Sequence, residues 1–221
     1  MNATEHVEVR TRSRGDGRPA DVQAPARSGE ALAEAACALI VSRQNVSPKR
    51  LVEPGPSVVQ LDRLFVAAAA APDHGQLLPW RFVIVPQDKR GLLADVFALA
   101  LIDRDPGATM VQIEAAREKA HRAPLLMLAV ARLVSEQEPE IPDLERMVSL
   151  GCAVQNMLLA SHAMGFGSGL TSGQAMASPR MRTLFTLSED ETAVCFVNVG
   201  SVSKRKPPRV RPSVEQFVSS L

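Results

Sequence analysis

Two clusters of basic residues are the part of the sequence best suited to chemistry. Arg43, Lys49 and Arg50 lie close together after one apolar segment, and a Lys-Arg-Lys run at 204–206 follows another apolar segment far along the chain. Guanidinium and ammonium groups bind phosphate through charge-assisted hydrogen bonds. If the fold brings the two clusters together they form an anion site. If it does not, they are solvated loop charges, which contribute little.

The familiar motifs of catalysis are absent from the sequence. The glycine-rich stretch 165–173, GFGSGLTSG, fits G-x-G-x-x-G in no register and follows a helical pattern, so no Rossmann dinucleotide site is expected. There is no Walker A motif and no G-x-S-x-G elbow. The four histidines, at 6, 74, 121 and 162, lack the spacing of a metal site. A Ser-His-Asp triad built from distant residues stays open.

Composition narrows the class of protein. The 221 residues are 46% hydrophobic and 22% charged, which is typical of a globular chain with its own core. A net charge of +1 and 4% aromatic residues argue against a nucleic-acid partner. No apolar run approaches the roughly 18 residues of a membrane span, and the polar start lacks a secretory signal. Cys37, Cys152 and Cys195 stand singly, which predicts reduced, buried thiols in a cytoplasmic protein.

Periodicity indicates the elements that must position these residues. Residues 1–28 are polar and aperiodic, so we expect a disordered leader before one domain over 29–221. Ser57 can cap a helix, and Ser178 with Pro179 can open a short one. We expect the tail to form an edge strand or to lie across a neighbour. The patterns predict helices at 28–43, 58–71, 89–105, 110–122 and 144–164, and strands at 81–86, 123–133 and 192–202.

The order of these elements favours an α+β fold, because helices come first and strands are then interspersed with helices. The run 123–133 is almost continuously apolar, which is typical of a strand covered on both faces. The helix from residue 144 is apolar nearly all the way round, so we expect it to be buried within the domain or against another subunit.

One segment makes the sequence comparable with a known family. Residues 71–82, APDHGQLLPWRF, with RLVEPGPS upstream and GCAVQNMLLASHAMGFGSGLTSG downstream, resemble the FMN-dependent nitroreductase family. The match is best to its compact bacterial branch, which carries A-P-D-H-x-x-x-x-P-W-x-F, and it extends from about Leu39 to Pro207. The resemblance implies a three-layer α+β sandwich with a central, mainly antiparallel sheet flanked by helices. It also implies an interlocked homodimer with one FMN in each of two interface clefts.

The resemblance implies an activity as well. Such enzymes take hydride from NADPH or NADH at N5 of FMN and deliver it to nitro compounds, quinones or similar acceptors in a ping-pong cycle. No catalytic side chain is implied, because the chemistry belongs to the cofactor. Three alternatives stay open: an FMN enzyme of another reaction type, a non-catalytic flavin-binding protein, and an apolar dimeric module without flavin.

The phosphate-binding residues carry over from the family's motifs. Its Arg-(Arg/His)-Ser loop matches Arg43, Gln44 and Asn45, and Lys49 follows. An alternative alignment puts Ser47 at the serine position of the motif, and no arginine then stands at the two basic positions before it. The second phosphate arm of the family matches the basic run that consists of Lys204, Arg205 and Lys206.

The remaining site residues lie around the expected flavin ring. His74 matches a histidine that reaches the flavin from the partner subunit; its alternative is a bond to its own loop backbone. Asp73 is expected to cap that turn, and Trp80 to pack beneath the cleft. Leu170, Thr171 and Ser172 match a segment along the ring where the branch has Trp-Arg-Ser, so only Ser172 agrees. These departures bear on the substrate more than on the cofactor.

Overall fold

The structure is a computed structural model of the chain that describes residues 29–133, 140–207 and 210–221. The expected leader, residues 1–28, lies outside the described residues. The helices fall within two residues of the predicted ends, except that the segment predicted over 110–122 is α-helical only to Arg117 and continues as a 3-10 turn to His121. In the described ranges they are α1 (Gly29–Ser42), α2 (Val58–Ala69), α3 (Arg90–Arg104), α4 (Met110–Arg117), α5 (Asp143–Ala163) and α6 (Pro179–Leu184).

Side-chain caps are present at the two helix starts that the sequence predicts from Ser57 and Ser178. The Oγ of Ser57 accepts the amide hydrogen bond of Gln60 at 3.4 Å, and the Gln60 side chain accepts from the Ser57 amide at 2.9 Å. This reciprocal pair is a capping box at the start of α2. Ser178 accepts from the amide of Arg180 at 3.2 Å, with Pro179 in the first turn of α6. Both predicted helix starts are confirmed.

The strands form one antiparallel sheet. β5 is the central strand: it pairs with β3, with β4 along its second half, and with β1 through its last two residues. β2 pairs with the other edge of β3. This confirms the predicted mainly antiparallel sheet. Its strands are β1 (Leu51–Val52), β2 (Trp80–Ile84), β3 (Leu125–Arg132), β4 (Gly167–Thr171) and β5 (Glu191–Val202).

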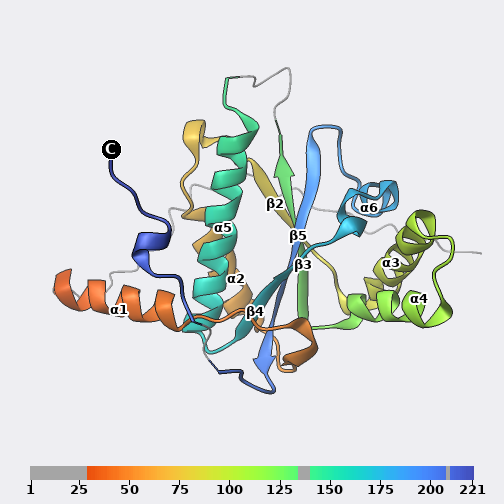
Figure 1. Cartoon of the computed structure of the whole chain (residues 1–221), viewed down its shortest axis with the longest axis horizontal. Coiled ribbons are helices and arrows are strands. Elements are labelled where there is room, and N and C mark those ends of the chain that lie inside the picture. The colour runs from red at the N-terminus through yellow and green to blue at the C-terminus, as the bar shows by residue number, and fades with distance from the viewer. Residues whose placement is uncertain (1–28, 134–139, 208–209) are drawn as a thin grey trace, which may run out of the picture.

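Helices cover both faces of this sheet. Figure 1 shows α2 and α5 on one side and α3, α4 and α6 on the other. Alternate residues of β3 point to the two sides: Met127 and Ala129 belong to the core beneath α2 and α5, whereas Leu126 and Leu128 belong to the core beneath α3 and α6. The three-layer α+β sandwich is therefore confirmed, as is a strand buried on both faces.

Two strands lie where the sequence indicates loops. β1 has only two residues, and β4 begins with Gly-Ser-Gly, which has low strand propensity. Gly169 is required in β4 because a Cβ there would lie 2.2 Å from the backbone oxygen of Val46. Pairing with β5 and this close backbone approach define β4, and neither is visible as a local pattern.

The two ends of the described chain also differ from expectation. α1 buries none of its residues, so the prediction that Cys37 is buried is wrong; Cys195 is buried, and burial raises the pKa of its thiol to about 11.

The tail forms a short 3-10 turn at Val214–Gln216 and no strand among its described residues. It lies beside α1 (Figure 1), where Arg211 Nη2 donates to the backbone oxygen of Arg43 at 2.7 Å. In the described ranges, no helix has the length and apolar character needed to cross a bilayer.

Candidate functional site

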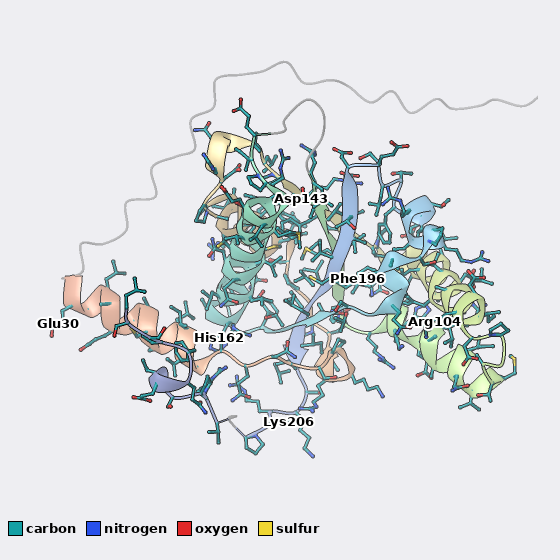
Figure 2. All side chains as sticks on the ribbon, turned by 45° about the horizontal axis from the view of Figure 1, so that its top comes forward. Glu30, Arg104, Asp143, His162, Phe196 and Lys206 are labelled. Carbon is teal, nitrogen blue, oxygen red and sulfur yellow. The ribbon has the colours of Figure 1, made fainter. Side chains whose placement is uncertain are left out.

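A cleft beside the last turn of α5 and the end of β5 brings the two predicted phosphate arms together. Figure 2 shows His162 at this end of α5 and Lys206 on the segment that follows β5. The residues that line the cleft are Ser42, Arg43, Gln44, Asn45, Val46, Arg50, His162, Phe166, Gly167, Ser168, Val202, Lys204, Arg205 and Lys206.

Backbone hydrogen bonds hold both arms in place. The Val46 amide donates to the oxygen of Ser168 at 2.8 Å, and Asn45 Oδ1 accepts from the Leu170 amide at 3.3 Å. These bonds fasten the first arm to β4. The amide and the hydroxyl of Ser203 both donate to the backbone oxygen of Arg50 at 3.0 Å, which places the 204–206 run beside the same arm.

The cleft is electrostatically positive and contains an incompletely bonded arginine. No Asp or Glu lines it, whereas Arg43, Arg50 and the 204–206 run do. Arg43 Nε is buried and has no hydrogen-bond partner among the described residues. The pKa of Arg43 is lowered, mainly because burial removes water and also because the charge of Arg211 is close. A bound anion would supply the missing acceptor and offset this repulsion, so the donor set fits a phosphate group.

His162 is a cleft residue that the sequence reasoning missed, and Arg50, named in the first basic cluster, lines the cleft although the family's motifs did not assign it to the phosphate. The 3-10 turn Pro48–Arg50 directs Arg50 along the cleft and leaves Lys49 exposed outside its lining, so a contact from Lys49 remains only a prediction. His162 lies in the last turn of α5, with Nε2 2.9 Å from Ser42 Oγ. A His at a helix C-terminus beside a basic loop is the signal that could have indicated it.

The Ser42–His162 pair is not part of a catalytic triad in the described structure. Ser42 Oγ also donates to the oxygen of Leu39 at 3.2 Å, and no carboxylate contacts His162 in the described ranges. Nothing there holds the imidazole in the orientation that a general base requires. The open possibility of a Ser-His-Asp triad therefore gains no support at this cleft.

His74 lies at the opposite end of α5. Its Nδ1 is 2.8 Å from Glu145 Oε2 in the first turn of that helix, and both side chains are largely exposed. The 17 positions between Glu145 and His162, at about 1.5 Å each, separate His74 from the cleft by about 25 Å. Within one subunit His74 does not reach the phosphate arms, and its contact with a flavin across a dimer interface remains a prediction.

The turn before β2 is structured as the sequence predicts. The two carboxylate oxygens of Asp73 accept from the amides of Leu77 and Leu78 at 3.2 and 2.8 Å, so Asp73 caps the turn. Trp80 is buried in the core beneath α2 and α5. Its role is packing, which confirms the second expectation.

A larger cavity of about 500 Å³ lies between the sheet and the α3–α4 pair. Thr171 and Ser172 are in its lining, whereas Leu170 is not. The buried Asn198 donates from Nδ2 to the oxygen of Gly169 and to Thr171 Oγ1, at 3.2 and 3.1 Å, and so fixes the end of β4. Pro48 lines this cavity and Arg50 lines the cleft, so the two hollows lie on either side of one short turn.

The fold and the two hollows define a class of protein: an α+β sandwich with a cationic cleft suited to a phosphate group and a larger, partly apolar cavity nearby. Comparison with known proteins identifies the family. The model of the nitroreductase family matches residues 47–201. A Haemophilus influenzae protein with the provisional name NAD(P)H nitroreductase is 32% identical over 187 residues, which cover 84% of this chain and 99% of that protein. The chain belongs to the nitroreductase family.

Solved structures show the same fold. A nitroreductase-like family protein from Bacillus cereus superposes with a TM-score of 0.71 at 16% identity, covering 84% of this chain and 95% of the other. The FMN-dependent nitroreductase NfnB from Mycobacterium smegmatis, solved in complex with NADPH, gives a TM-score of 0.64 at 16% identity, covering 86% and 99%. These likenesses confirm the predicted nitroreductase-like fold.

Proposed function

We propose that this protein is an FMN-dependent NAD(P)H oxidoreductase whose cationic cleft holds the phosphate of FMN. The observation that carries the proposal is the buried Nε of Arg43, which has no partner among the described residues and lies in a cleft without carboxylates. Membership of the nitroreductase family and the names of the relatives, which include NAD(P)H and FMN-dependent nitroreductases, support it.

The residues of the cleft and of the segment at the end of β4 would hold different parts of the cofactor. Arg43, Arg50 and the 204–206 run would bind the phosphate, and 170–172 would lie along the ring, with Asn198 holding Thr171 in place. When bound, FMN would supply hydride chemistry at N5 for a ping-pong reaction between NADPH or NADH and a nitro compound, quinone or similar acceptor. The cations around it would offset negative charge that develops on the reduced cofactor.

The active form in this proposal is a homodimer. Apolar side chains remain exposed on the helices that cover one face of the sheet: Leu144 and Val148 on α5, and Val59 and Val66 on α2, are 59–75% exposed. A second copy of the chain would cover such surfaces and bring its His74 toward the flavin. A cytoplasmic location and the division into a leader (1–28) and one domain (29–221) remain predictions.

The absorbance spectrum of the purified protein, before and after NADPH, tests the function. A yellow protein that NADPH bleaches supports it. Bound flavin that neither NADPH nor NADH bleaches indicates a non-catalytic flavin protein or an FMN enzyme of another reaction type, and a preparation that stays colourless with added FMN refutes the proposal.

Replacing Arg43 tests the phosphate assignment separately. Arg43→Ala should weaken FMN binding about tenfold or more, because hydrogen bonds to charged groups are worth about 1.5–3 kcal/mol. Lys89→Ala, an exposed cation outside the cleft, is the matched control and should bind FMN as the wild type does. Unchanged FMN affinity in Arg43→Ala would refute the assignment.

A further inference from the structure

We propose that the cavity between the sheet and α3–α4 binds the electron acceptor and selects an aromatic acceptor that carries a negative charge. This inference rests on the proposed oxidoreductase function and deepens it by naming a substrate class. It follows from the floor, the rim and the position of the cavity.

The floor of the cavity is apolar and suits a planar ring. Phe97 from α3 and Phe196 from β5 meet edge to face with centroids 5.7 Å apart, and Leu126 and Met176 lie in the same lining. Aromatic side chains favour stacked or edge-to-face contact with another ring, and such contact adds to the burial of apolar area. A volume of about 500 Å³ lies within the usual range for a small-molecule site.

The rim of the cavity carries positive charge that is not neutralised locally. Arg104, Lys119 and Arg122 are in the lining, and no Asp or Glu is. Neither Arg104 nor Lys119 forms an ion pair within the described ranges. Arg122 approaches Glu118 only to 4.0 Å, and the Glu118 side chain is 65% exposed. Figure 2 shows Arg104 on the α3 side of the sheet that carries Phe196.

Two acidic residues near this rim bind cations that lie outside the cavity lining. Asp103 accepts two hydrogen bonds from Arg180, at 2.6 and 3.0 Å, and Asp95 pairs with Arg117. The charged side chains in the cavity lining are therefore all cations, above an apolar floor. A ring with a carboxylate or other anionic group complements both features, and a neutral ring complements only the floor.

The position of the cavity links it to electron transfer. Thr171, Ser172 and Gly173 form part of its wall, next to the turn that also borders the phosphate cleft. A molecule in the cavity would lie against the segment expected along the flavin ring. The dinucleotide co-substrate also carries rings and, on its phosphates, negative charge, so the test must separate acceptor from dinucleotide.

The test compares 4-nitrobenzoate with 4-nitrobenzamide, which differ mainly in charge, as acceptors for the FMN-loaded enzyme. We expect kcat/KM to favour the anion about tenfold, and Arg104→Gln and Lys119→Gln each to lower this ratio about threefold, as expected for partly exposed charges. Lys89→Gln removes the same charge outside the cavity and should leave the ratio unchanged. A ratio near one in the wild type overturns the proposal. The proposal is also overturned if neither variant changes the ratio of the two kcat/KM values but both lower kcat/KM for NADPH. The cations would then bind the dinucleotide.

Calorimetric binding of the same two compounds separates this proposal from the oxidoreductase function. The cavity assignment is supported if 4-nitrobenzoate binds more tightly than 4-nitrobenzamide and the Arg104→Gln/Lys119→Gln double variant loses this difference. This holds even if neither compound is reduced, because the absence of reduction would count only against the oxidoreductase function. Equal or undetectable binding of both compounds overturns the cavity assignment. Reduction of the neutral compound with equal binding would leave the oxidoreductase function standing.

Discussion

Gly169→Ala should disrupt the link between the phosphate arm and β4. A Cβ at this position would lie 2.2 Å from the oxygen of Val46 and 3.1 Å from Asn45 Oδ1. Relief of the backbone contact requires a displacement of about 1 Å, because side-chain carbons in protein cores rarely approach within about 3 Å of other heavy atoms. Segment 45–46 would have to move away from β4.

The displacement weakens two hydrogen bonds, from Val46 to Ser168 and from Leu170 to Asn45, which are 2.8 and 3.3 Å long. At about 1 kcal/mol each, with some strain added, the free energy of unfolding should fall by about 2–3 kcal/mol. FMN binding should also weaken, because Asn45 and its neighbour Arg43 leave their places in the cleft.

Urea unfolding followed by circular dichroism, at fixed protein and FMN concentration, measures the first effect, and flavin fluorescence titration measures the second. Gly91→Ala is the matched control: a Cβ there meets nothing within 4 Å, so this exposed helical position should gain up to about 1 kcal/mol. The reasoning is refuted if the free energy of unfolding of Gly169→Ala lies within about 0.5 kcal/mol of the wild-type value, which is about the error of the method, and the variant binds FMN equally well.

Three other predictions concern the scaffold. The Arg81 guanidinium lowers the pKa of Glu191, so this pair stabilises the fold above the ordinary carboxyl pKa and loses its effect as the pH falls through the lowered value. Arg81→Leu should therefore cost about 2 kcal/mol at pH 7 and less near pH 4, in urea unfolding at both values; an equal cost at both would contradict this. Arg90→Met should cost about 3 kcal/mol or more by the same measurement, because the buried guanidinium donates to backbone oxygens of residues 85, 120 and 122–124; a loss below about 1 kcal/mol would count against it. Ser57→Ala should cost about 1 kcal/mol and shift thermal unfolding accordingly, whereas Ser213→Ala, in the exposed tail, should not.

The parts of the fold that could be predicted from the sequence depend on local patterns. The helix starts at Ser57 and Ser178 follow from side chains within three residues of each cap, and β3 follows from a continuous apolar run. β4 could not be predicted because its glycines carry no strand preference; its partners on β5 and the Val46 oxygen define it.

The candidate site depends more on contacts between distant segments. The two basic clusters were visible in the sequence, but their meeting depends on Ser203 binding the oxygen of Arg50, 153 positions earlier. Whether Arg50 or Lys49 lines the cleft is decided by a three-residue turn. The cavity cations Arg104 and Lys119 look like ordinary solvated charges in the sequence, because only the packing of α3 and α4 against the sheet makes them face a common space.

The central claim is that the cationic cleft binds the phosphate of FMN, and the most direct test compares FMN with riboflavin, which lacks that phosphate. Titration of flavin-free protein should give an affinity for FMN about 100-fold or more above that for riboflavin, and the difference should shrink with added salt. Equal affinities for FMN and riboflavin would contradict the account.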